Sequence, residues 1–300
     1  MKIIVAGGTG LLGGPLCATL AAEGHHVVVL TRQATPAAPD RADVVRWRPD
    51  GGVGDWASGL HDADAVINLT GESLAGGRWT AARKQRLRDS RLLPTRSLVA
   101  AIRSSARPPD VLLNASAIGY YGDRGDELVT ESTPAGDDFA ARLCVDWEVE
   151  ATAAASDSTR VALIRTAPVL ARDGGLLAQM ALPFKLFVGG PMGSGHQYLP
   201  WIHLDDWVRL VQWMLESDVT GAVNACAPAP VTNAAFSRAL GGALGRPSWL
   251  RAPAPAIRLA LGEMATMVLA GQRAMPAKAI ERDVPFKYGN LDEALRSIYR

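Results

Sequence analysis

The sequence predicts an α/β fold, a doubly wound parallel sheet that carries a smaller, mostly helical C-terminal lobe. Two observations point to it. Short continuous apolar runs alternate with helical stretches over the first two-thirds of the chain, and a glycine-rich turn follows the first of these runs. Apolar strands separated by helices are typical of a parallel sheet buried on both faces, and right-handed crossovers then wind the chain in two layers.

The expected elements follow in order along the chain. Strands are predicted at 3–6, 26–30, 44–45, 65–69, 111–115 and 161–164, where β-branched and other apolar residues cluster. Helices are predicted at 11–23, 80–103 and 137–155, the second of them bent at Pro94 because proline removes a helical hydrogen bond.

The texture of the sequence changes after about residue 165, where glycine and proline become frequent. We therefore predict a sheet domain over 1–170, with later returns to the sheet, and a second lobe over 171–300. The tail from Ser248 onward is expected to be mostly helical, broken by prolines. The lobe should pack at the carboxyl edge of the sheet, where open α/β sheets hold their ligands.

Composition excludes several classes of protein. With 31 Lys/Arg against 30 Asp/Glu, the chain lacks the basic surplus of a general nucleic-acid binder. No apolar run reaches the roughly 18 residues of a membrane helix, and the start lacks a signal peptide's pattern, so we expect no membrane partner and a cytoplasmic protein. Three widely spaced cysteines predict buried thiols rather than disulfides. No metal site is expected, since His203, Asp205 and Asp206 suit a turn that opens a helix.

The glycine turn predicts a dinucleotide site in a Rossmann-like fold. Gly7-Gly8-Thr9-Gly10-Leu11-Leu12-Gly13 lies between the first strand and the first helix. Gly7 would make the tight turn, Gly10 would let the backbone approach a pyrophosphate, and Gly13 would let helix and strand pack closely. The helix N-terminus would then present free N–H groups to the phosphates.

The end of the second strand indicates which dinucleotide is bound. An NAD enzyme usually has Asp or Glu there, to bond the ribose hydroxyls. This chain has Thr31-Arg32 instead. A guanidinium pairs with a 2′-phosphate, and no carboxylate repels it, so the sequence favours NADP (NADPH).

With these residues in place, the chain resembles the extended short-chain dehydrogenases/reductases. Further stretches resemble an atypical group of that superfamily, the epimerase family, whose C-terminal domain of unknown function is matched by about 248–298. They are Val66 to Glu72, Arg78-Trp79, Ser90-Arg91, Gly119 to Gly122, Gly189 to Asp206, Asn224, Pro228 and Thr232-Asn233. The resemblance also implies cofactor contacts at Leu69, Thr70, Gly71, Arg91 and Val169.

The resemblance exposes one departure from the superfamily. Ordinary members carry a Tyr-x-x-x-Lys pair on the helix after the fifth strand, in which the tyrosine moves the proton. The aligned positions are here Phe139 and Leu143, and no Tyr-x-x-x-Lys occurs in the chain. Reduction or epimerisation by that pair is therefore excluded.

Other side chains are candidates for the missing acid or base. Glu72 follows the fourth strand beside the expected nicotinamide position, and Tyr120 and Tyr121 follow the fifth strand. Ser116, at the end of the fifth strand, could bond a substrate oxygen. Each also has a structural interpretation: Glu72 as a helix cap, the tyrosines as loop packing, and Ser116 as an ordinary strand-end serine.

Two functions follow from these features. The first is an NADP(H)-dependent oxidoreductase or epimerase acting on an unknown small carbonyl or hydroxyl compound. The second is a non-catalytic NADP(H)-binding sensor or regulator, including a role in cell division, which the resemblance to some relatives implies. An open crevice with Glu72 or a tyrosine hydroxyl near the nicotinamide favours the enzyme, and a crevice filled by the tail favours the sensor. The superfamily fold also implies a possible homodimer.

Overall fold

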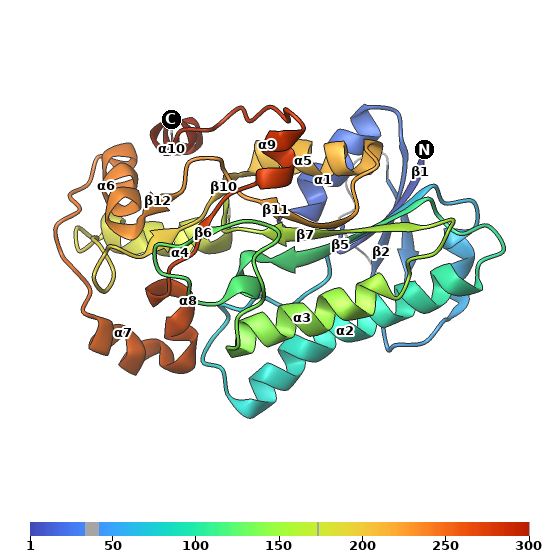
Figure 1. The fold of residues 1–300 in the computed structure, drawn as a ribbon, viewed down its shortest axis with the longest axis horizontal. Helices are drawn as coiled ribbons and strands as arrows, with labels where there is room; N and C mark the ends of the chain where they lie inside the picture. Colours follow the sequence, from blue (N-terminus) through green and yellow to red (C-terminus); the bar gives the residue numbers. More distant parts are fainter. Residues whose placement is uncertain (34–41, 173, 300) are drawn as a thin grey trace.

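The computed structural model describes residues 1–33, 42–172 and 174–299. Seven parallel strands form the central sheet in the order β11-β7-β5-β4-β1-β2-β3 (Figure 1). They are β1 (Lys2–Ala6), β2 (His26–Thr31), β3 (Asp43–Arg46), β4 (Ala65–Asn68), β5 (Val111–Ala117), β7 (Arg160–Thr166) and β11 (Gly221–Ala225). The expected α/β fold with a doubly wound parallel sheet is confirmed.

Helices cover both faces of this sheet. On one face lie α1 (Gly13–Ala22) and α5 (Leu204–Glu216), and on the other lie α2 (Ala81–Ser104) and α3 (Phe139–Thr152) side by side (Figure 1). Successive strand residues alternate between the two layers: Ile3 and Val5 pack with α1 and α5, whereas Ile4 packs with α2. The helix α2 continues through Pro94.

The sheet has one strand that the sequence analysis missed. In β11 only Val223 is β-branched, and glycine and alanine supply most of the rest, so the composition carries no strand signal. The strand pairs with β7 from Gly221–Ala162 to Ala225–Thr166. It adds an outer edge to the sheet, next to the C-terminal lobe.

A second core holds the C-terminal lobe together. Its helices include α4 (Gly175–Lys185), α6 (Asn233–Leu244), α7 (Ala254–Leu261), α8 (Thr266–Leu269), α9 (Ala277–Glu281) and α10 (Leu291–Tyr299). The buried side chains of this core come from α4, α6 and α10 and surround Trp201: they include Leu177, Phe184, Phe236, Leu240, Leu291 and Leu295. The helix α10, the last one within the described residues, is therefore part of the lobe's core.

The segment 268–275, called the strap below, ties the C-terminal lobe to the loop after β5. Its β13 (Arg273–Ala274) pairs with β6 (Leu128–Val129). The Gly271 N–H donates to Asp123 at 2.9 Å, and the Gln272 side chain donates to the Gly122 carbonyl at 2.7 Å. Short pairings this far apart in sequence left no pattern to predict.

Three further findings bear on the expectations from composition. Cys17, Cys144 and Cys226 are all free and buried, as predicted. Within the described ranges, no helix combines the length and the apolar character needed to cross a membrane. The same residues hold no group of three or more His, Cys, Asp or Glu side chains placed to bind a metal ion.

Candidate functional site

The glycine turn after β1 forms a backbone cradle. Gly7 has φ +85°. The N–H of Gly10 donates to the Gly7 carbonyl at 3.1 Å, and this hydrogen bond closes the turn. A Cβ on Gly13 would lie 2.3 Å from that carbonyl, so no side chain fits there. A Cβ on Gly10 would meet only the Gly7 oxygen, at 3.3 Å, and otherwise points into open space. The three glycines thus have different reasons to be glycine.

This cradle opens into a cavity of about 700 Å³ at the carboxyl ends of β1, β2 and β4. Nine of the residues predicted from the sequence line it: Gly7, Thr9, Gly10, Thr31, Arg32, Leu69, Thr70, Gly71 and Glu72. Others, such as Trp47, Arg86 and Leu93, had no signal in the sequence that marked them as lining residues.

The groups around the cavity fit a phosphorylated dinucleotide. No side chain caps the N-terminus of α1, where Leu12 is the N-cap residue, so the positive end of the helix dipole faces the turn without a competing carboxylate. The cavity wall at the end of β2 consists of Thr31, Arg32 and Gln33, with Arg32 exposed. A cationic side chain stands where an acidic one would select NAD.

Asn68 fixes the turn that forms the opposite wall. This fully buried residue at the end of β4 donates to Asn114 at 2.6 Å and to Thr95 at 2.9 Å. The Oδ1 of its side-chain amide accepts from the hydroxyl of Thr70 at 2.6 Å and from the Thr70 N–H at 3.2 Å. The polar residue that ends an apolar run was the only sequence signal for this role.

Five predicted cofactor residues lie outside the residues that line the cavity: Leu11, Leu12, Gly13, Arg91 and Val169. Arg91 is buried behind the Gly71-Glu72 turn and donates to the Glu72 carbonyl at 3.0 Å and to the Leu87 carbonyl at 3.1 Å. Burial lowers the pKa of its guanidinium from the ordinary value. In this arrangement, Arg91 supports the cavity wall.

Glu72 lines the cavity but is already engaged. Its carboxylate forms an ion pair with the largely buried Arg83, and Arg86 approaches to 4.0 Å. The Glu72 N–H donates to the hydroxyl of Ser90 at 3.1 Å. The carboxylate is therefore held at the mouth of the cavity, with about two-fifths of its side chain exposed.

Ser116 belongs to a buried network that joins β5, α3 and β7. Its hydroxyl donates to Glu148 at 2.6 Å, and Arg165 binds both oxygens of the same carboxylate at 2.8 Å. All three residues are buried. A charged pair inside the protein needs this full set of bonds, which explains why the serine faces inward.

The network also holds the two tyrosines. Tyr121 is fully buried, donates to Asn224 at 2.6 Å and accepts from Arg165 at 2.9 Å. Burial raises the pKa of the Tyr121 hydroxyl to about 12. The ring of Tyr120 stacks on the guanidinium of Arg165, at 3.4 Å from its centroid. For Tyr121 the packing interpretation describes the observed position.

The face of α3 that meets β5 differs from the sequence alignment. Phe139 packs against Trp79 with ring centroids 5.1 Å apart, on the side of α2. Cys144 and Glu148, four residues apart on α3, face Ser116 instead. Cys144 is fully buried, which raises the pKa of its thiol to about 12. Neither residue is a lysine or a tyrosine, so the absence of the usual pair holds on the observed face as well.

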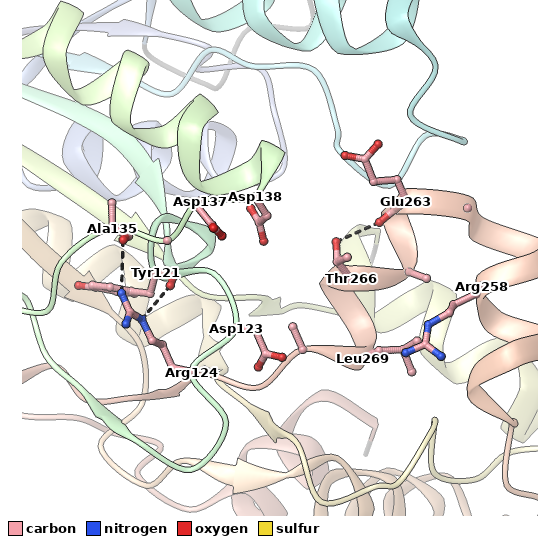
Figure 2. Close-up of a pocket in the computed structure, with 14 residues that line it drawn as sticks. Tyr121, Asp123, Arg124, Ala135, Asp137, Asp138, Arg258, Glu263, Thr266 and Leu269 are labelled. Atoms are coloured by element: carbon pink, nitrogen blue, oxygen red, sulfur yellow. Dashed lines mark hydrogen bonds between the residues drawn. The ribbon is translucent and has the colours of Figure 1, made fainter.

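A second cavity, of about 890 Å³, lies between the loop after β5 and the C-terminal lobe (Figure 2). Asp123, Asp137 and Asp138 occupy one side of it, and Arg258 of α7 lies on the other. Tyr121 contributes to the wall, but its hydroxyl points into the buried network. Two of the acids serve the fold: Asp123 binds the strap, and Asp138 caps α3.

Comparisons with known proteins agree with this geometry. Residues 3–226 match the profile of the "NAD dependent epimerase/dehydratase family", and residues 252–298 match a domain of unknown function, DUF1731. The chain is 42% identical over 295 residues to "Epimerase family protein Mb2239" of Mycobacterium bovis, covering 98% of this chain and 96% of the relative.

Solved structures are similar over the whole chain. A crystal structure of human epimerase family protein SDR39U1 with NADPH superimposes with a TM-score of 0.91 at 34% identity, covering 100% of this chain and 99% of that one. A nucleoside-diphosphate sugar epimerase from Corynebacterium glutamicum gives a TM-score of 0.80 at 31% identity, covering 100% of this chain and 58% of that one.

Proposed function

Since this chain belongs to the NAD dependent epimerase/dehydratase family, we propose that it binds NADPH in the 700 Å³ cavity and acts as an oxidoreductase. Its substrate would be a small carbonyl or hydroxyl compound, and its location the cytoplasm. The observation that carries the proposal is the combination in one cavity of the Gly7–Gly10 cradle and Arg32 at the end of β2.

Different residues of the cavity would bind different parts of the cofactor. The Gly7–Gly10 turn and the uncapped start of α1 would hold the diphosphate, and Arg32 would pair with the 2′-phosphate. The Leu69–Gly71 turn, fixed by Asn68, would supply the opposite wall. The human relative crystallised with NADPH supports this choice of dinucleotide.

The chemistry of the bound dinucleotide is hydride transfer, and this chain has to orient it and supply a proton. Of the proposed catalytic side chains, Glu72 alone lines the cavity. Arg83 and Arg86 keep its carboxylate at the mouth. We therefore propose Glu72 as the acid/base group, ahead of Tyr120, and assign Ser116 and Tyr121 to the support of the sheet ends.

Cofactor titration and turnover test this proposal separately. NADPH should bind more tightly than NADH, as measured by quenching of protein fluorescence. NADPH oxidation is then followed with a panel of aldehydes and ketones. Glu72→Gln should lower turnover by about 10²–10⁴-fold and leave NADPH affinity nearly unchanged. Equal affinities for the two dinucleotides would overturn the cofactor assignment, and full turnover by Glu72→Gln would overturn the role of Glu72.

One observation favours the second candidate, a non-catalytic NADP(H) sensor. The strap is bonded to the loop that follows the carboxyl end of β5, and the Tyr121 hydroxyl is buried. A sensor predicts different backbone hydrogen exchange in the strap with NADPH and with NADP⁺, and no turnover on any carbonyl compound. Identical exchange in the two states excludes it.

A further inference from the structure

A contiguous apolar patch lies on the C-terminal lobe, far along the sequence from the cofactor cavity. It consists of six large side chains that are 42–67% exposed: Leu182, Leu186, Phe187, Val188, Trp249 and Leu250. Together they expose on the order of 500 Å² of apolar surface, about the size of the largest patch on a typical monomer, which is often functional. The residues are called the Phe187 patch below.

Backbone contacts join the two segments of this patch. Trp249 donates its indole N–H to the Phe187 carbonyl at 3.3 Å, and the Leu250 N–H donates to the Gly189 carbonyl at 3.2 Å. A Cβ on Gly190 would lie 2.3 Å from the Leu250 oxygen, so the chains touch directly. The patch is therefore one surface, built from the end of α4 and the segment after α6.

Phe187 is held in an unfavourable backbone conformation. Its φ is +64°, and it follows the last turn of α4. The Phe187 N–H donates to the Phe184 carbonyl, and the Val188 N–H donates to the Pro183 carbonyl. Phe187 directly follows the C-cap residue Leu186, at the position where glycine is usual because an L side chain is strained there. The chain places an exposed aromatic ring at a position where glycine would favour folding.

The two chain segments that carry the patch contain basic residues and no acidic ones. Segments 174–204 and 219–262 contain no aspartate or glutamate, although the whole chain has 30 of them. They contain five basic residues: Lys185, Arg238, Arg246, Arg251 and Arg258. Lys185, Arg246 and Arg251 adjoin patch residues in sequence or lie within a few residues of them, and all three are exposed. The guanidinium of Arg246 lies 4.6 Å from the ring centroid of Phe187.

We propose that the Phe187 patch docks the protein on an anionic lipid surface. Exposed tryptophan, phenylalanine and leucine beside Lys and Arg are the composition that binds the headgroup boundary of a bilayer. The expectation of no membrane partner rested on the lack of a spanning segment. That lack leaves contact with the surface of a bilayer open.

Other occupants fit this surface less well. In a symmetric contact with a second copy, the patch of one copy would face the patch of the other. Arg246 and Arg251 of both copies would then lie close together, and the two segments supply no carboxylate to neutralise them. Peptides usually bind in a groove, and no residue of the Phe187 patch lines either of the two cavities described above.

Co-sedimentation of the full chain with vesicles tests the proposal. The protein should bind vesicles of phosphatidylcholine mixed with phosphatidylglycerol, bind pure phosphatidylcholine much more weakly, and dissociate as salt rises. Arg246→Glu with Arg251→Glu should weaken binding by at least about 25-fold, since each basic residue near such a surface contributes about fivefold. Arg103→Glu, on an exposed site of α2, is the charge control.

A glycine variant separates docking from folding. Phe187→Gly should abolish vesicle binding and melt no lower than the unchanged protein, because it relieves the positive φ. Leu186→Asp should also abolish binding. Val149→Asp, at a single exposed apolar residue of α3, should not.

Three results would overturn the proposal. They are no binding to anionic vesicles at low salt, equal binding to neutral vesicles, and a dimer in analytical ultracentrifugation that Phe187→Gly converts to monomer. The last would show that a second copy covers the patch.

Discussion

The guanidinium of Arg32 is exposed at the end of β2, beside the cavity that the glycine cradle opens. Replacing Arg32 by alanine removes the expected partner of a 2′-phosphate. We expect NADPH affinity to fall by about 1–3 kcal/mol, the contribution of a hydrogen bond to a charged group, while NADH affinity barely changes. Fluorescence titration measures both, with Arg103→Ala as the matched arginine control. An equal loss for both dinucleotides would contradict the assignment.

Substitutions at Gly10 and Gly13 should affect different properties, cofactor binding in the first case and stability in the second. Gly10→Val projects into open space, so we expect a folded protein, by circular dichroism, that has lost NADPH binding. Gly13→Ala places a Cβ 2.3 Å from the Gly7 oxygen, so we expect a lower melting temperature. Retention of binding by folded Gly10→Val would show that phosphate is held elsewhere.

The buried thiol of Cys144 makes stability fall in alkaline solution. Burial raises its pKa from 9.0 to about 12, so above pH 9 the unfolded chain loses this proton while the folded chain keeps it. The free energy of unfolding should therefore decrease between pH 9 and 12, by up to about 1.4 kcal/mol per pH unit for each such group.

Urea unfolding at several pH values tests this. Cys144→Ala should flatten the decrease, and Cys17 and Tyr121, whose pKa values are also raised to about 12, should account for part of the remainder. An unchanged slope in Cys144→Ala would contradict the prediction.

At the scale of single residues, the sequence predicts roles that depend on local backbone sterics and misses those that depend on distant side chains. The tight turn at Gly7 and the close packing at Gly13 could be predicted, because sterics alone restrict the residue type there. The role of Gly10 depends on the cofactor and stays a prediction. The burial of Tyr121 could not be predicted, since its partners Arg165 and Asn224 come from two other strands. Nothing local in a tyrosine's sequence context says which way its hydroxyl points.

At the scale of elements, the Glu148–Arg165 pair attaches α3 to β7. Glu148→Ala would leave a buried guanidinium without its carboxylate, so we expect a loss of about 3–5 kcal/mol in the free energy of unfolding. Glu150, on the same helix, pairs with the half-exposed Arg96, and Glu150→Ala should cost less than about 1 kcal/mol. Urea denaturation measures both variants, and comparable losses would refute a special role for the buried pair.

Six strands of the central sheet and the long helices of the first two-thirds could be predicted, because each carries its own periodic or continuous apolar pattern. Strand β11 could not be, as its alanines and glycine have low strand propensity and it forms by pairing with β7. On α3, Leu143 packs with Phe139 and Trp79, whereas its neighbour Cys144 faces Ser116. Both residues are apolar, so the helical period alone does not say which of them faces β5.

At the scale of the whole molecule, the C-terminal tail is part of the fold. A chain ending at residue 251 would lose α10 and the strap, exposing Phe184, Trp201 and Phe236. We expect it to be recovered as aggregate, as judged by gel filtration. Leu295→Ala in the full chain should remain folded but lose about 2–5 kcal/mol, the cost of truncating a buried leucine. A stable, monomeric 1–251 chain would contradict this view.

The general position of the cavity at the carboxyl edge of the sheet could be predicted, because parallel strands bring their ends together. The strap could not, since two-residue strands such as β6 and β13 leave no pattern in the sequence. The apolar patch was equally hidden: exposed and buried leucines look alike until the helix α4 has a defined inner face.

The position of α10 has a consequence for the order of events during synthesis. Its residues, the last described helix of the chain, complete the core around Trp201, which was translated almost a hundred residues earlier. All seven strands of the central sheet are translated before this helix. The sheet can therefore form before the core of the lobe is complete, and until α10 has been made, Trp201 and its neighbours are a natural target for chaperones.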